Sequence, residues 1–152
     1  MDTNTMSSTA TTPGPVPDRF VQSWLALWNG DHTQAGALIA DGLHVHAAMM
    51  DGGDGAAINS AATLVEWIAQ TRAAVPDLTF TTQVGPIVDG DHLALRWRAV
   101  GTYAGGLPGA TAPAGTTVDF TGTDVLRVTD GRLAEYWVNS DTLLLLTQLQ
   151  AS

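Results

Sequence analysis

Four side chains that can transfer a proton lie in otherwise apolar segments of the sequence. His44 and His46 alternate in LHVHAAMM, which puts both imidazoles on one face of a predicted strand. Asp124 lies in the middle of FTGTDVLRV, a predicted buried strand, and Tyr136 lies in RLAEYWVNS. An imidazole exchanges protons near neutral pH, and burial raises the pKa of a carboxyl group into the range of a general acid. These four residues are the candidate catalytic groups.

The sequence is also compatible with a structural role for each candidate. The two histidines would then be partly exposed at a dimer interface, and Asp124 would accept a hydrogen bond from Tyr136 or from an arginine. Arg96 and Arg98 alternate with apolar residues on another predicted strand, so we expect cross-strand or dimer-interface pairs with Asp or Glu. Two histidines without a convincing third ligand do not predict a metal site.

Aromatic residues predict a cavity for a flat or apolar ligand. Five tryptophans is a high number for this length, although an aromatic residue at helical or alternating spacing is more often part of the core. Tyrosine hydroxyls would orient the ligand, and a methionine side chain would form an adaptable wall. The candidate substrate-binding residues are Trp28, Trp67, Trp97, Tyr103, Asn139 and Met49.

Periodicity and turn signals predict the elements that hold these residues. Asp18, Ser60 and Asp141 are expected helix N-caps. The long Gly/Pro/Ala-rich connection 104–117 is predicted to be a flap over a site. In the strand HLALRWRAVGTY, Leu93, Leu95 and Trp97 share one face. We expect the order helix, helix, strand, helix, four strands and helix, over residues 18–28, 33–40, 43–50, 61–75, 77–90, 92–103, 118–128, 132–140 and 142–149.

This order predicts one α+β domain, residues 18–152, in which helices cover one face of a curved antiparallel sheet. Residues 1–17 lack the basic and apolar regions of a signal peptide, so no secretory signal is expected, and they are predicted to form a disordered tail. The net charge of −9, with no lysine, argues against nucleic acid and anionic membranes as partners. No apolar run is long enough to cross a bilayer, and the absence of cysteine fits a cytoplasmic protein.

Several segments together resemble the SnoaL-like polyketide cyclases, which have the cone-shaped nuclear transport factor 2-like fold. The resemblance covers about residues 20–150 and is carried by WNGDHTQAGALIADGLHVH, AAVPDLTFTTQVGPIVDGDHLALRWRAVGTYAG, PAGTTVDFTGTDVLRVTDGRLAEYW and DTLLLLTQLQ. It implies a deep apolar pocket inside the cone, with the face of His44 and His46 turned into it. It also implies a homodimer through the outer face of the sheet, and no metal or organic cofactor.

The resemblance also locates a departure from the family pattern. The Asp that performs acid/base chemistry in the aldol-type cyclases corresponds to Val138 of this chain, which we therefore add to the candidate substrate-binding residues. In the related limonene epoxide hydrolases, the Asp-Arg-Asp positions correspond to Trp97, Ala99 and Val138. Asp124 corresponds to a polar pocket residue that is often His. The carboxylate of either mechanism is therefore missing.

The resulting prediction is a cofactor-independent cyclase of polyketide or related secondary metabolism, such as antibiotic biosynthesis, that folds a small apolar, polycyclic or polyene precursor. In one version the pocket holds a linear polyene and polarises one carbonyl, as a pericyclic [4+2] closure requires. In another, Asp124 or His46 serves as the acid or base of an aldol-type cyclase, an isomerase or a dehydratase. A non-catalytic protein that binds a hydrophobic metabolite is the third alternative.

Overall fold

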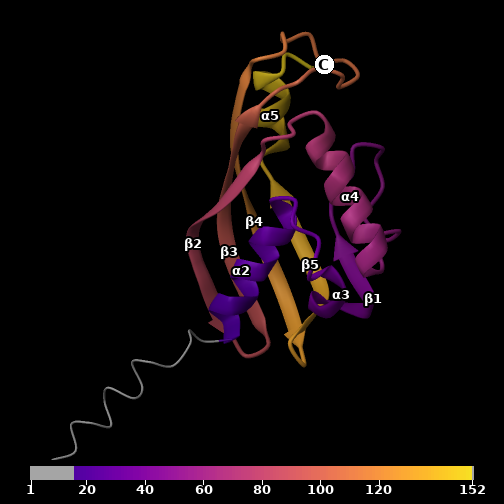
Figure 1. Ribbon diagram of the computed structural model, residues 1–152, viewed down its shortest axis with the longest axis vertical. Coiled ribbons are helices and arrows are strands. Elements are labelled where there is room, and N and C mark those ends of the chain that lie inside the picture. Colours follow the sequence, from indigo (N-terminus) through magenta and orange to yellow (C-terminus); the bar gives the residue numbers. More distant parts are fainter. Residues whose placement is uncertain (1–15, 152) are drawn as a thin grey trace, which may run out of the picture.

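The computed structural model describes residues 16–151 and contains the expected order of helices and strands (Figure 1). The predicted tail, residues 1–17, lies outside the described residues except for Val16 and Pro17, which already belong to the first helix. The elements are α2 (Val16–Trp28), α3 (Ala35–Leu38), β1 (Ile39–His46), α4 (Ala61–Ala73), β2 (Thr79–Asp89), β3 (His92–Thr102), β4 (Thr117–Thr129), β5 (Arg132–Ser140) and α5 (Thr142–Gln148).

The five strands form one sheet in the order β1-β5-β4-β3-β2. Strands β2 to β5 are antiparallel as expected, but β1 pairs with β5 in parallel, so the prediction of an antiparallel sheet is wrong for this strand. The reason is that no hairpin joins β1 to β5, and only a tight turn forces neighbouring strands to run in opposite directions.

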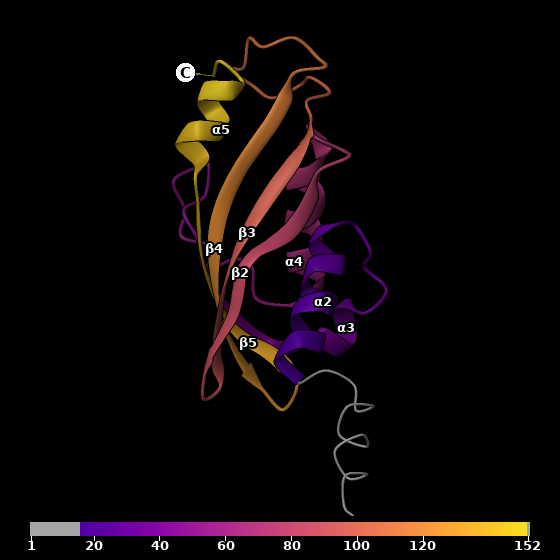
Figure 2. The same ribbon diagram turned by 90° about the vertical axis from the view of Figure 1, so that its left-hand side faces the viewer.

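Three helices, α2, α3 and α4, cover one face of the curved sheet, whereas α5 lies on the other side beside β4 (Figure 2). Alternation along β3 fixes which residues meet the core. Trp97 and Ala99 are buried on the covered face, and Arg96 and Arg98 are exposed on the outer face, which confirms the expected register. Among residues 16–151, no helix is long and apolar enough to cross a membrane.

Helix starts were predicted correctly where a side chain caps the helix. Ser60 and Thr63 form a capping box at α4, and Asp141 accepts a hydrogen bond from Leu144 N (3.2 Å) at α5. At α2 the prediction was wrong, because Asp18 lies in the first turn and not at the N-cap. Pro17 explains the earlier start, since its fixed φ is compatible with the first turn of a helix.

The predicted flap packs against the end of the chain instead of covering a site. Thr111 N donates to the carbonyl of Gln150 (3.3 Å), and Ala112 N donates to the carbonyl of Leu149 (3.1 Å). None of the connection 104–116 lines the aromatic cavity between the helices and the sheet, which is described below. The prediction of a flap is therefore wrong, because this connection packs against residues 149–151, which follow α5.

Helix α5 also protects an open edge of the sheet. β5 pairs with β4 only over Gly122–Thr129, so the first part of β4 has no strand beside it. There the Gln148 side chain replaces a strand, because its Nε2 donates to Asp119 O (2.8 Å) and its Oε1 accepts from Asp119 N (2.9 Å). Such protection blocks pairing of the edge with another chain.

Removing this amide should destabilise the protein. We expect Gln148→Ala to lower the free energy of unfolding by about 1 to 2 kcal/mol, because two hydrogen bonds to a strand edge are lost. Urea denaturation of the purified variant measures the loss. The matched control is Gln70→Ala, at an exposed position of α4. Equal denaturation midpoints for the two variants would contradict the role of Gln148.

Candidate functional site

A cavity of about 140 Å³ lies between the helices and the covered face of the sheet. Its wall is mainly aromatic, and α2, α4 and strands β2 to β5 all contribute rings to it: Trp24, Trp28, Trp67, Phe80, Trp97, Phe120 and Tyr136. These rings pack against one another largely edge to face, for example Trp24 on Tyr136 with centroids 4.9 Å apart. The interior of the cavity is therefore mainly apolar.

The base of the cavity holds one carboxyl group, that of Asp124, which is only 2% exposed. Its Oδ2 accepts a hydrogen bond from Trp24 Nε1 (2.9 Å), and its Oδ1 accepts from Trp97 Nε1 (2.9 Å) and from the Tyr136 hydroxyl (3.4 Å). The sequence predicted the Tyr136 contact as one structural interpretation, whereas neither indole contact was foreseen.

Burial dominates the electrostatics of this carboxyl group. Desolvation raises the pKa of Asp124 to about 6, although the hydrogen bonds from Trp24, Trp97 and Tyr136 act in the opposite direction. Burial beside Asp124 also raises the pKa of Tyr136 well above its usual value, so this phenol stays protonated. Asp124 is thus the group of the cavity that changes charge near neutral pH.

Gly122 allows Trp97 to reach Asp124. A Cβ atom at position 122 would lie 2.1 Å from Cζ2 of the Trp97 ring, which is far inside van der Waals contact. Because Gly122 and Trp97 are direct partners across β3 and β4, the indole lies over the glycine and directs its N–H toward Asp124. The sequence alone showed a glycine within a strand and gave no sign of this role.

The mouth of the cavity is polar. The exposed residues of the lining are Ala48, Thr71, Asn139 and Ser140, from the loop after β1, from α4 and from the end of β5. Val138 lines the cavity deeper inside and is the direct partner of Asp124 across β4 and β5. The lining therefore contains seven of the predicted site residues: Trp28, Trp67, Trp97, Asp124, Tyr136, Val138 and Asn139.

The two histidines do not face the cavity, and this prediction is wrong. Leu43 and Val45 are the buried residues of β1, so His44 and His46 project from the outer face of the sheet. The His46 ring stacks on Trp137, with centroids 5.2 Å apart, and its Nε2 lies 2.7 Å from Glu135 Oε2. Strand β1 joins the sheet with its apolar residues inward because those residues fill the core.

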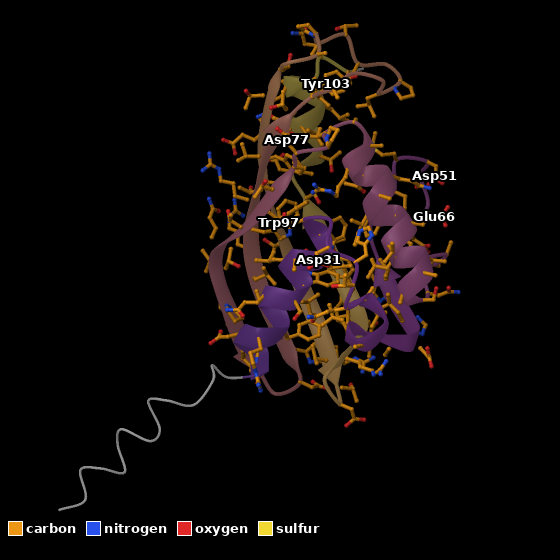
Figure 3. All side chains as sticks on the ribbon, viewed as in Figure 1. Asp31, Asp51, Glu66, Asp77, Trp97 and Tyr103 are labelled. Atoms are coloured by element: carbon orange, nitrogen blue, oxygen red, sulfur yellow. The ribbon has the colours of Figure 1, made fainter. Side chains whose placement is uncertain are left out.

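Two other candidates also lie outside the cavity lining. Tyr103 is buried at the end of the sheet near the connection 104–116, far along the sheet from Trp97 (Figure 3), and its hydroxyl accepts from Leu107 N (2.9 Å). Met49 packs partly buried against the core, whereas its neighbours Ala47 and Ala48 line the cavity. The prediction that Tyr103 and Met49 contact substrate is therefore not supported by their positions.

Outside the cavity, one arginine has the expected cross-strand partner. Arg98 on β3 forms a bidentate pair with Asp119 on β4, at 2.8 and 2.6 Å. Arg96 instead donates to the side chains of Gln83 and Thr121. Within residues 16–151, no group of three or more acidic or histidine side chains is placed to hold a metal ion.

Comparison with solved structures identifies the class of fold. IdmH from Streptomyces antibioticus, a candidate polyketide cyclase, is 28% identical, with a TM-score of 0.75 over 89% of this chain and 99% of that one. A candidate polyketide cyclase from Acidithiobacillus ferrooxidans is 24% identical, with a TM-score of 0.74 over 93% and 100%. A Catenulispora acidiphila protein with a ketosteroid isomerase-like fold, in complex with trimethylamine, is 19% identical, with a TM-score of 0.68 over 88% and 93%.

The sequence itself gives the family. The model of the SnoaL-like polyketide cyclases matches residues 18–149, and the chain belongs to this family. Comparison with curated proteins gave no match. The expected family and the nuclear transport factor 2-like fold are thus confirmed.

The raised pKa of Asp124 predicts a distinctive dependence of stability on pH. Because its pKa is about 6 in the folded state against an ordinary 3.8, the folded protein binds more protons between these values. The contribution of Asp124 to the free energy of unfolding is therefore greatest below pH 4 and falls as the pH rises to 6, by about 3 kcal/mol in all.

Denaturation of the wild-type protein and of Asp124→Asn at several pH values between 4 and 8 measures this contribution. Carboxyl groups with lowered pKa, such as those of Asp119 and Glu135, act in the opposite direction but are common to both proteins. The difference in stability between wild type and variant should therefore decrease from pH 4 to 6. A difference that stays constant would show that Asp124 titrates normally.

Proposed function

We propose that this protein is a cytoplasmic, cofactor-independent cyclase of polyketide or related secondary metabolism, and that Asp124 transfers the proton in ring closure. One observation carries the proposal: a single carboxyl group, 2% exposed, lies at the base of an aromatic cavity with a pKa of about 6. Membership of the cyclase family supports ring closure as the reaction.

The chemistry follows from the charge of Asp124. At neutral pH most of this carboxyl is ionised, so it can remove a proton from a carbon next to a substrate carbonyl, leaving an enolate. The enolate carbon then bonds to a second carbonyl carbon, and the resulting alkoxide takes the proton back from Asp124. No proton is gained or lost overall, and the dry cavity strengthens each electrostatic interaction.

The position of Asp124 supports its use in place of the family carboxylate. Val138 stands where the aldol-type relatives carry their Asp, and Asp124 is its direct partner on the neighbouring strand. Both side chains line the cavity. The acid/base group would therefore lie one strand away from the family position, and it would act on a substrate in the same cavity.

A second candidate function follows from the apolar residue at position 138. With Val138 on one side and aromatic rings around it, the cavity would hold the ring-forming segment of a linear polyene in a folded conformation. Protonated Asp124 would then donate a hydrogen bond to a carbonyl and promote a [4+2] closure without removing a proton. The two candidates require opposite protonation states of the same carboxyl group.

Proton exchange tests the first function without knowledge of the natural substrate. The protein should accelerate exchange of the α-protons of 2-tetralone, a bicyclic ketone, in D₂O, as measured by NMR. Asp124→Asn should lower this acceleration by about 100-fold or more, the usual effect of a positioned base. His46→Ala, on the outer face of the sheet, is the control and should retain it. Exchange that persists in Asp124→Asn would rule out Asp124 as the base.

The pH profile separates the two candidates on a linear precursor. For the base, the rate should rise with pH through about 6 and then level off, because the ionised form acts. For the pericyclic closure, the rate should fall over the same range, and Asp124→Asn should keep much of it because an amide can still donate a hydrogen bond. A precursor that quenches tryptophan fluorescence but is released unchanged would indicate a binding protein.

We also propose a homodimer through the outer face of the sheet. Ile87, Ala94, Val125 and Trp137 are successive partners across β2 to β5, and His46 of β1 pairs with Trp137. This row crosses the whole outer face and begins at Ile87, which is 63% exposed.

Sedimentation velocity tests the dimer. The wild type should sediment as a dimer, and Ile87→Glu should shift it toward monomer because a charge is placed in an apolar contact. Leu143→Glu on α5, at another strongly exposed apolar position, is the control. A monomeric wild type would contradict the proposal.

A further inference from the structure

We infer that the cavity discriminates by charge: it accepts uncharged and cationic ring systems and rejects rings that carry a carboxylate. The inference rests on the proposed function only in taking the cavity as the place where substrate binds. It deepens that function, because it states which form of a substrate can reach Asp124.

The described part of the chain offers no cation to an anion in the cavity. The sequence has no lysine, and none of its six arginines belongs to the lining. Arg72 follows the lining residue Thr71, but its guanidinium donates to the backbone carbonyls of Trp28, Pro76 and Leu78. The other arginines are exposed or bound elsewhere: Arg19, Arg96, Arg98, Arg127 and Arg132.

Three hydrogen-bond donors next to Asp124 are already occupied. The N–H groups of Trp24 and Trp97 and the hydroxyl of Tyr136 all point to Asp124. Other polar lining side chains, such as Asn139 and Thr71, lie at the mouth. A bound anion would therefore face an ionised carboxylate with no cation beside it, and the buried N–H of Trp28, which has no partner among the described residues, is a neutral donor that compensates little of a full charge.

The size of the cavity determines how close the substituents of a ligand come to the charge of Asp124. A volume of about 140 Å³ is close to that of a protein cavity that admits one benzene ring. A carboxylate attached directly to the ring that enters would thus lie close to Asp124, whereas a distant one would remain in water beyond the mouth. Groups that donate a hydrogen bond, such as an enol or phenol O–H, complement the ionised carboxylate.

Three planar probes of nearly equal shape test the inference: benzamidine, which is cationic, benzamide, which is neutral, and benzoate, which is anionic. Binding to the full chain is measured at pH 8 by tryptophan fluorescence and by ligand-observed NMR. We expect benzamidine and benzamide to bind and benzoate to bind at least about 10-fold more weakly than benzamide. At pH 5, where Asp124 is protonated, the discrimination between the probes should shrink because the charge of Asp124 is removed.

Two variants separate the charge of Asp124 from its hydrogen bonding. Asp124→Asn should weaken benzamidine and strengthen benzoate, with little effect on benzamide. Tyr136→Phe removes one hydrogen bond but keeps the charge, so it should preserve the order of affinities. Circular dichroism confirms that each variant is folded.

Some outcomes would contradict charge selection and leave the proposed function intact. Benzoate binding as tightly as benzamide at pH 8, an unchanged order in Asp124→Asn, or no binding of benzamidine and benzamide would each reject charge selection. Loss of 2-tetralone exchange in Asp124→Asn would still support the acid/base role in that case. Conversely, charge selection together with unimpaired exchange would reject only the acid/base role.

Discussion

The structure depends on one carboxyl group that accepts hydrogen bonds from three elements. Trp24 of α2, Trp97 of β3 and Tyr136 of β5 all donate to Asp124 of β4. Only a group that accepts at both of its oxygens can satisfy these donors, and an amide would leave at least one of the indoles without a partner. Asp124 therefore helps to join the helical layer to the sheet and is also the carboxyl group of the cavity lining.

The burial of this carboxyl group has a cost that its hydrogen bonds partly offset. Burial disfavours the ionised form of Asp124, and the raised pKa reflects this cost. The three hydrogen-bond donors reduce the cost of ionisation but do not remove it. A carboxyl in this balance can exchange a proton near neutral pH without a second titrating group nearby. The aromatic rings contribute the apolar surroundings that raise the pKa and the N–H and O–H groups that limit the rise.

Local signals in the sequence, such as alternation and capping residues, predicted much of the fold. The site depends on contacts between residues far apart in the sequence, which local signals do not reveal. Alternation in β3 predicted the side of Trp97, and Ser60 and Asp141 marked helix starts because capping is local. The side of β1 was assigned from the family pattern and was wrong for His46, although buried Leu43 and Val45 alternate with the histidines. Trp24 was not among the predicted site residues, because its bond to Asp124 spans 100 positions and no local signal reveals it.

The attachment of α2 has a consequence for how a ligand leaves the cavity. Besides the bond from Trp24, Asn29 at the end of this helix exchanges two hydrogen bonds with the backbone of Phe80 on β2, at 3.1 and 2.7 Å. The wall formed by α2 cannot swing aside without breaking these bonds, so the mouth lined by Asn139 and Ser140 is the passage for a ligand in both directions. One ligand must then leave before the next can enter.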